Sequence, residues 1–167
     1  FPLKLNGKDM ERTELGYFSQ QMHLNVGTNT FTLTHKEKTI TIKATYKVVV
    51  IREVSPVGTQ RLEGSTQFSV SAICLQGSTA KATFMGKTIA LSPTAISNDT
   101  DVSNDGTGYA IYTGSFTLPA ATASEQTVGP VKFSATYKGQ TETKTGAKFT
   151  IPAKAEETTV SEGSSLP

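Results

Sequence analysis

The chain has 167 residues, a formal net charge of +2, no Trp and one Cys. So small a charge gives no indication of a nucleic-acid partner, and no apolar run is long enough to span a membrane. Cys74 cannot form an internal disulfide, and we expect it to be a buried apolar thiol. The threonine-rich composition, with few helix-forming runs, favours an all-β fold.

The chain begins with a hairpin signal and continues into a long alternating stretch. Asn6-Gly7 is a dipeptide that favours a type I′ turn. From Gly16 to Ile51, apolar and polar residues alternate in three runs separated by turn residues, which predicts three antiparallel strands. The core residues expected from this stretch are Phe18, Leu24, Phe31, Leu33, Ile40 and Ile42.

The alternation is interrupted at Arg52–Gly58, where Ser55-Pro56 and Gly58 indicate an irregular connection. We therefore place a module boundary there, with one module over 1–52 and a second over 53–152. Residues 153–167 carry three Glu against one Lys and little apolar surface, which predicts an acidic linker or tail.

The second module contains further strand signals and two long loops. The predicted loops are Ser92–Gly108 and Ala120–Pro130, and Lys138-Gly139 is predicted to turn the chain between the last two strands. The expected core consists of the alternating apolar residues Phe68, Val70, Cys74, Phe84, Ile111, Phe116, Val131, Phe133 and Phe149.

The two halves form an internal repeat. The segments NGK, GYFSQQMHL and FTLTHKEKTITIKA of the first half match MGK, YTGSFTLP and FSATYKGQTETKTG of the second, in the same order. The second copy has about 30 residues ahead of its Gly-Lys hairpin and the first only five, so the first module is expected to lack its opening strands. Either the chain is cut within a module, or the module is naturally short and pairs with its neighbour.

These patterns predict an all-β protein of two antiparallel β-sandwich modules in tandem, the first of them incomplete; the resemblance given below implies that the modules are Ig-like. Backbone groups left without a partner strand would then form an exposed edge near Phe1–Leu5 or beside Phe31–Leu33. Because Phe1 is not a start Met and no signal peptide is present, we expect a processed or excised piece of a longer protein.

The sequence offers no catalytic constellation. His23 and His35 are the only His bases, and both fit surface positions on strands or turns. Two His with a Cys in the other module do not supply a zinc site. The loop containing Asp99, Asp101 and Asp105 has the oxygen ligands that calcium prefers, but these residue types are also the commonest loop formers. We expect no catalytic residue and no cofactor.

Binding residues are sought in the long loops and among exposed side chains. Tyr112 lies on the opposite strand face from Ile111, which would leave its ring exposed, but packing or an interface is the favoured role for it and for Tyr109. Four lysines suggest a basic face, although lysine also discourages edge-to-edge pairing; they are Lys36, Lys38, Lys43 and Lys47. The binding candidates are Tyr109, Tyr112, Asn104, Lys36 and Lys38.

Two resemblances extend this interpretation. Gly16-Tyr17-Phe18 and the motif LNVGTN at 24–29 resemble bacterial Ig-like modules that occur in secreted glycosidases, adhesins and cell-wall enzymes. The second half, SPVGTQRLEGSTQFSVSAICLQGSTAKATFMGKTIAL followed by YTGSFTLP, resembles the non-catalytic region of Firmicute N-acetylmuramoyl-L-alanine amidases. Those enzymes use a zinc site of His and Glu in a separate α/β domain, which no segment here matches.

The resemblance implies a non-enzymatic scaffold or targeting region of a secreted hydrolase that acts in peptidoglycan turnover. The parent protein would be a zinc-dependent amidase, located outside the cell or at the bacterial cell surface. Its expected partners are peptidoglycan or another cell-wall glycan and the rest of the parent chain, with no nucleic acid and no membrane span. The alternative is a carbohydrate-binding or adhesion module of another bacterial surface protein.

Overall fold

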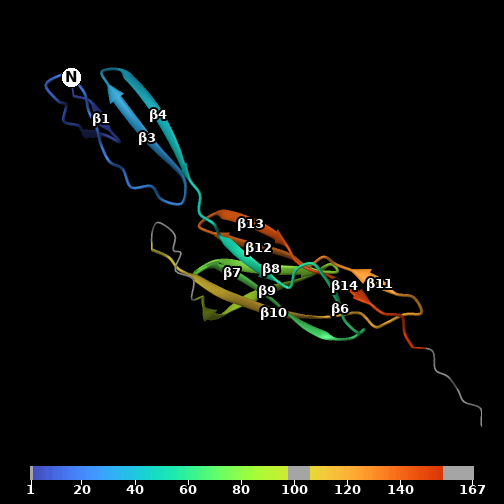
Figure 1. Cartoon of the computed structure of the whole chain (residues 1–167). Coiled ribbons are helices and arrows are strands. Elements are labelled where there is room, and N and C mark those ends of the chain that lie inside the picture. Colours follow the sequence, from blue (N-terminus) through green and yellow to red (C-terminus); the bar gives the residue numbers. More distant parts are fainter. Residues whose placement is uncertain (1, 98–105, 156–167) are drawn as a thin grey trace, which may run out of the picture.

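The structure, a computed structural model, describes residues 2–97 and 106–155. These residues form strands and connecting turns without a helix, so the all-β prediction is confirmed. Nothing among them could serve as a membrane-crossing helix. Figure 1 shows the strands β1–β4 at one end of an elongated molecule and the strands β5–β14 in the larger part.

The N-terminal sheet, as we name strands β1–β4, has the order β2-β1-β3-β4. Two hairpins build it: β1 (Lys4–Leu5) with β2 (Lys8–Asp9), and β3 (Gly27–His35) with β4 (Lys38–Tyr46). The first turn is the predicted Asn6-Gly7 pair, with φ angles of 50° and 83° that fit a type I′ turn. β1 pairs with β3 only at Leu33 and Thr34. Among the described residues, no strand therefore lies beside 27–31 on that side of β3.

The first of the three predicted runs is not a strand. Residues 16–25 have no strand pairing, and the side chain of Phe18 is 43% exposed. The third run also stops at Tyr46, earlier than the sequence predicts. Alternation alone therefore identified segments able to form strands, whereas pairing also requires a neighbouring strand.

The residues predicted to form the core of the first module are less buried than the sequence predicts. Leu24, Phe31 and Leu33 are half-buried, while Ile40 and Ile42 are 61% and 44% exposed. The register pairs Phe31 with Ile42 and Leu33 with Ile40, so these four residues share one face of the sheet. They form an apolar face, and no strand of the described residues forms a second layer over it.

The second part, which we call the C-terminal sandwich, covers residues 48–151 and consists of a seven-stranded and a three-stranded sheet. The order in the larger sheet is β13-β12-β8-β9-β10-β7-β5, and in the smaller one β11-β14-β6. The strands are β5 (Ile51–Ser55), β6 (Thr59–Arg61), β7 (Gln67–Leu75), β8 (Thr79–Phe84), β9 (Lys87–Ile96), β10 (Tyr109–Thr117), β11 (Gln126–Val128), β12 (Lys132–Tyr137), β13 (Gln140–Thr145) and β14 (Lys148–Ile151).

The larger sheet folds back on itself, because its edge strands β13 and β5 contact each other. The last predicted strand is divided at Gly146-Ala147, after which β14 joins the smaller sheet. A Cβ at Gly146 would lie 2.7 Å from Cε2 of Phe133 and 3.0 Å from the carbonyl oxygen of Pro56, so only glycine fits where the chain changes sheets. The predicted loop 92–108 also begins late, because β9 continues to Ile96.

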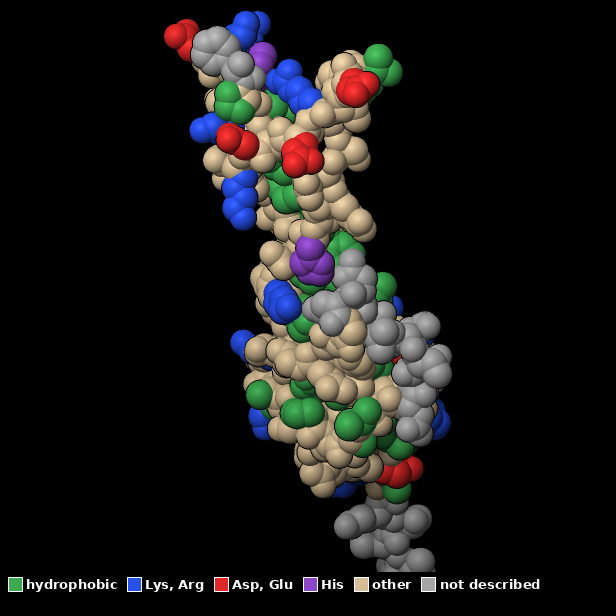
Figure 2. Space-filling view, turned by 90° about the vertical axis from the view of Figure 1, so that its left-hand side faces the viewer, with side chains coloured by type: hydrophobic (Ala, Val, Ile, Leu, Met, Phe, Trp, Pro, Cys, Tyr) green, Lys and Arg blue, Asp and Glu red, His purple; other side chains and the backbone are tan. Residues whose placement is uncertain are grey.

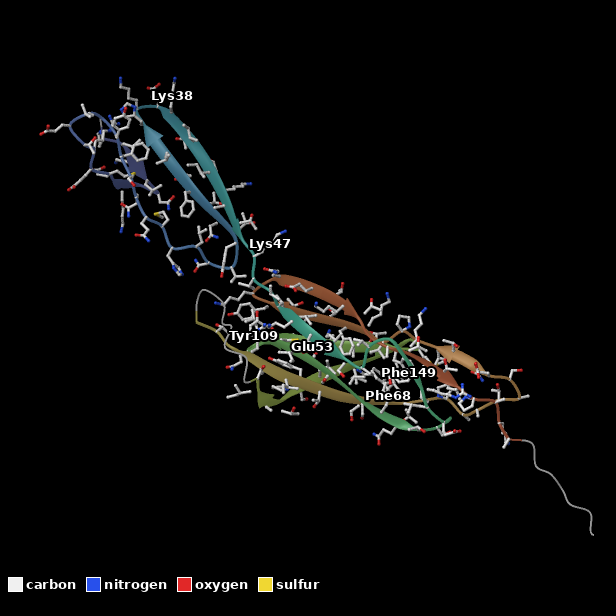
Figure 3. The ribbon with its side chains drawn as sticks, viewed as in Figure 1. Lys38, Lys47, Glu53, Phe68, Tyr109 and Phe149 are labelled. Carbon is white, nitrogen blue, oxygen red and sulfur yellow. The ribbon has the colours of Figure 1, made fainter. Side chains whose placement is uncertain are left out.

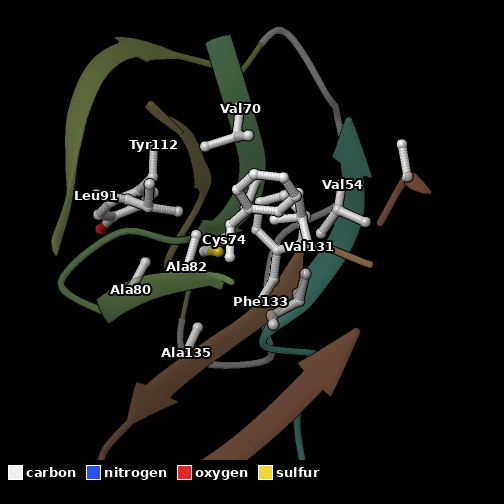
Figure 4. Close-up of a cluster of buried hydrophobic side chains, with 14 of the residues drawn as sticks. Val54, Val70, Cys74, Ala80, Ala82, Leu91, Tyr112, Val131, Phe133 and Ala135 are labelled. Atoms are coloured by element: carbon white, nitrogen blue, oxygen red, sulfur yellow. The ribbon is translucent and has the colours of Figure 1, made fainter. Parts of the chain in front are cut away.

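The core of the C-terminal sandwich agrees with the expected list except at Ile111, which is half-buried. Figure 4 shows part of this cluster, with Cys74 among Ala82, Val131 and other apolar side chains. Phe68 has its ring centroid 4.2 Å from that of Phe149 and 5.3 Å from that of Phe84. Aromatic pairs of this kind add about 0.5–1.5 kcal/mol each to the effect of burial.

The internal repeat seen in the sequence is present in the topology. Four adjacent strands of the C-terminal sandwich have the order β9-β8-β12-β13, which matches the order β2-β1-β3-β4. In this match the β8–β9 hairpin corresponds to β1–β2, and the β12–β13 hairpin to β3–β4. Pairing changes from one sheet to the other between Tyr46 and Ile51, a few residues before the predicted boundary. The division into 1–52, 53–152 and 153–167 stays a prediction.

Candidate functional site

The junction between the two parts is held by side chains from the edge strand β13. Residues 47–50 belong to no strand, yet Val48 donates its N–H to Gln140 Oε1 at 3.0 Å, and Val50 donates to Glu142 Oε2 at 2.6 Å. Ile51 donates to the other oxygen of Glu142 at 3.3 Å. Because Gln140 and Glu142 are two residues apart, they lie on one face of β13. The side chains of Gln140 and Glu142 therefore hold residues 48–51 beside β13 in place of backbone-to-backbone hydrogen bonds.

Tyr109 and residues from the N-terminal sheet complete this junction. The Tyr109 hydroxyl donates to the carbonyl oxygen of Val49 at 2.6 Å, and the guanidinium carbon of Arg52 lies 5.1 Å from the centre of the Tyr109 ring. Val26 and Tyr46 are partly buried against the core of the C-terminal sandwich. Figure 3 places Tyr109 at the end of the sandwich next to the N-terminal sheet. The path of the chain between the sheets is therefore fixed.

Tyr112 is a packed residue, as the favoured interpretation of the sequence has it, and not an exposed ring. Tyr112 is 3% exposed, and its hydroxyl donates to the carbonyl oxygen of Leu75 at 3.3 Å. Burial, followed by the nearby Cys74 thiol, raises the pKa of Tyr112. Tyr109 is buried as well. Neither ring is therefore accessible for stacking on a ligand, which leaves packing as the role that the structure gives them.

The remaining loop candidates fall largely outside the described residues. Asp99, Asp101, Asn104 and Asp105 belong to that gap in the structure. Next to it, a surface hollow of about 400 Å³ lies between the end of β9 and the turn that joins β7 to β8. Its lining consists of Gln76, Gly77, Pro93, Thr94, Ala95, Ile96, Ala110 and Tyr112.

Lys36 and Lys38 lie at the turn between β3 and β4, where they line a second hollow of about 740 Å³ with His35 and Glu37. Lys36, Lys38, Lys43 and Lys47 do not form one continuous basic face. Regular pairing along β4 places Lys38 on the side of Ile40 and Lys43 on the opposite side, while Lys47 lies beyond the end of β4. Figure 3 shows Lys38 and Lys47 at opposite ends of β4, and Figure 2 shows basic side chains spread around this end of the molecule.

The groups considered for catalysis are dispersed. His23 is exposed on the segment without strand pairing, and His35 is half-buried at the β3–β4 turn. Burial, with a smaller contribution from Glu142, raises the pKa of the Cys74 thiol to about 12, so this thiol is held in its unreactive protonated form. Within 2–97 and 106–155, no three His, Cys, Asp or Glu side chains are grouped so that they could hold a metal ion.

Gln140 and Glu142 are not among the residues predicted from the sequence. Both stand in the strand that repeats KTITIKA of the first half, where Lys38 and Ile40 occupy the matching positions. The signal was the polar pair Glu142 and Lys144, at positions where the first copy has Ile40 and Ile42.

The comparisons with known proteins identify no family. No family model matches the sequence, and a search of curated proteins finds no match.

Proposed function

We propose that the chain is a non-catalytic scaffold or targeting region of a secreted cell-wall hydrolase, similar to the corresponding region of N-acetylmuramoyl-L-alanine amidases. One observation carries the scaffold role: residues 48–51 are held by Gln140, Glu142 and Tyr109 through five hydrogen bonds. A spacer must keep its neighbouring modules at a defined direction, and a connection fixed in this way limits their relative motion.

The scaffold role is tested by NMR relaxation on the intact chain. We expect the amides of the N-terminal sheet and of the C-terminal sandwich to share one rotational correlation time. In the variant Gln140→Ala/Glu142→Ala, the two correlation times should separate while both sheets keep their chemical-shift pattern. A matched control is Thr141→Ala/Thr143→Ala, which changes the intervening exposed residues of the same strand. Independent tumbling of the two parts in the wild-type chain would contradict the proposal.

The cell-wall assignment is tested with insoluble peptidoglycan. We expect the purified chain to sediment with this material and to release no new amino groups from it. Amidase cleavage frees the amine of the peptide stem, so a rise in amine content would show that the chain is itself catalytic. Failure to sediment would remove the targeting role and leave the spacer role, which the relaxation experiment measures separately.

A second candidate is a carbohydrate-binding or adhesion module, which the hollow beside β9 favours. Gln76 and Thr94 provide amide and hydroxyl groups at its surface, next to the 73% exposed side chain of Ile96. Amphipathic sugar rings are held by such mixtures of polar and apolar contacts. If this hollow binds glycan, Gln76→Ala/Thr94→Val should reduce sedimentation with peptidoglycan, and Thr127→Val, on the distant strand β11, should not.

A further inference from the structure

The N-terminal sheet contains the same two hairpins as the C-terminal sandwich. In β3–β4, Phe31 pairs with Ile42 and His35 with Lys38. In β12–β13, Phe133 pairs with Lys144 and Tyr137 with Gln140. These pairs occupy equal positions in the repeat, so the two hairpins have the same register. The sandwich therefore shows how a sheet of this type is completed.

In the sandwich, completion depends on the strand β7. β10 lies between β7 and β9, and its Gly114-Ser115-Phe116 corresponds to Gly16-Tyr17-Phe18 in the repeat. Phe116 pairs with Phe68 of β7 and is buried. The first copy contains the β10-like segment without a strand equivalent to β7, and here residues 16–24 stay unpaired and Phe18 is exposed. The missing neighbour explains why the alternating segment has not formed a strand.

The edge strand β4 of the N-terminal sheet also lacks the neighbour that its counterpart β13 has in the sandwich. On β13, Glu142 accepts hydrogen bonds from the residues that begin β5. The matching residue on β4 is Ile40, whose side chain is exposed, as is that of Ile42 next to it on the same face. An apolar residue at this position is suited to an apolar side chain of an incoming strand, and it has no other partner layer among the described residues.

We propose that the N-terminal sheet is an acceptor for a strand pair of the β5–β7 type, joined on the N-terminal side of β1. The occupant is an extended segment with alternate apolar residues, like Phe68, Val70, Ala72 and Cys74 of β7. On its addition, Gly16–Leu24 pairs with it as a strand, and Phe18 and Ile40 become more buried. This inference is independent of the proposed function. The connectivity follows the sandwich, where β7 precedes the β8–β9 hairpin by a three-residue turn.

The test is the 167-residue chain with a copy of residues 48–78 added ahead of Phe1. We expect the exchange rates of the amide hydrogens of residues 17–24 to fall at least about tenfold, because these residues join a hydrogen-bonded sheet. The matched control carries the same added segment with serine at the copied positions of Phe68, Val70 and Ala72. It can form the same backbone bonds but cannot cover the apolar face, so exchange should remain as fast as in the original chain.

Two results would overturn the proposal. One is equal exchange rates for residues 17–24 with the added segment and with its serine control. The other is a concentration-dependent dimer of the original chain that Ile42→Lys abolishes, since this would make a second copy the occupant of the apolar face. Sedimentation velocity on the original chain and on Ile42→Lys decides between these occupants without requiring the added segment to fold.

Discussion

The N-terminal sheet and the C-terminal sandwich have the same order of hairpin strands, yet equivalent residues in them differ in burial. Phe133 is buried at a position where Phe31 is only half-buried, and Phe116 is buried where Phe18 is exposed. The hairpins themselves follow from turns between neighbouring residues, and in both parts the two hairpins then join through one long-range pairing, β1 with β3 or β8 with β12. Burial follows from strands β5, β7 and β10, for which the first copy has no paired equivalent.

The difference shows which interactions hold each part together. In the sandwich, apolar side chains from several strands meet in one cluster, and burial of such side chains is the main favourable contribution to folding. The N-terminal sheet depends more on its ladders and on the short β1–β2 hairpin. Small sheets with one uncovered face are only marginally stable, so we expect this part to unfold first.

The largest expected effect is at the paired phenylalanines. Phe133→Ala should lower the free energy of unfolding of the sandwich by about 3–5 kcal/mol, because it removes a fully buried ring. Phe31→Ala, at the equivalent repeat position, should cost the N-terminal sheet about 1 kcal/mol. Guanidinium unfolding with hydrogen exchange resolved by residue measures both. Equal losses would mean that the two parts have equally buried cores.

A smaller effect is expected at the junction. Glu142→Ala removes the acceptor for the N–H groups of Val50 and Ile51, and an unsatisfied buried donor costs about 1–3 kcal/mol. The amides of these two residues should exchange faster, which NMR can follow directly. Ile40→Ala, the same position in the first copy, should change stability by less than about 0.5 kcal/mol. A similar loss of stability in Glu142→Ala and Ile40→Ala would mean that the edge strands β13 and β4 do not differ in their contacts.

Alkaline pH should weaken the sandwich through Cys74. Its pKa is raised from 9.0 to about 12 on folding, so the stabilising contribution is complete below pH 9 and is lost as the pH rises from 9 to 12. At pH 10 the loss is about 1 kcal/mol, because only the unfolded thiol ionises there. Urea unfolding at pH 8 and pH 10 should show a smaller pH effect in Cys74→Ala. An identical effect in the wild-type chain and the variant would exclude this thiol as the cause.

The smallest effect on stability is expected on the open apolar face. Ile40→Thr/Ile42→Thr should change the free energy of unfolding by no more than about 0.5 kcal/mol, because both side chains are exposed. Binding of a hydrophobic fluorescent dye should fall, since the exposed patch is removed. The matched change Val70→Thr in the sandwich should instead destabilise the fold. A large loss in the double variant would show that the face is covered in solution.

Features that depend on neighbouring residues could be predicted from the sequence. Asn6-Gly7, Met85-Gly86 and Lys138-Gly139 all form turns with positive φ at both residues, and each turn joins two paired strands. The alternation in β7 also identified its buried face, with Phe68, Val70, Ala72 and Cys74 inside. In both cases the physical cause lies within a few residues of the pattern.

Features that depend on a second layer could not be predicted. The pattern around Phe18 is that of a strand, but alternation does not reveal whether a partner is present. Ile111 was expected in the core, but Tyr112, on the opposite face of β10, is the more deeply buried of the two. The junction residues Gln140 and Glu142 bind backbone groups more than 90 positions away, a distance that no local motif encodes.

The connection at residues 47–50 has a mechanical consequence. When the chain is pulled from its two ends, tension passes through this segment, and the bonds from Gln140 and Glu142 are loaded before the ladder between β5 and β7. Release of those side-chain bonds would straighten four residues, which span at most about 14 Å when extended. The molecule would thus lengthen by a short, reversible step under load, while the strands of both sheets remain paired.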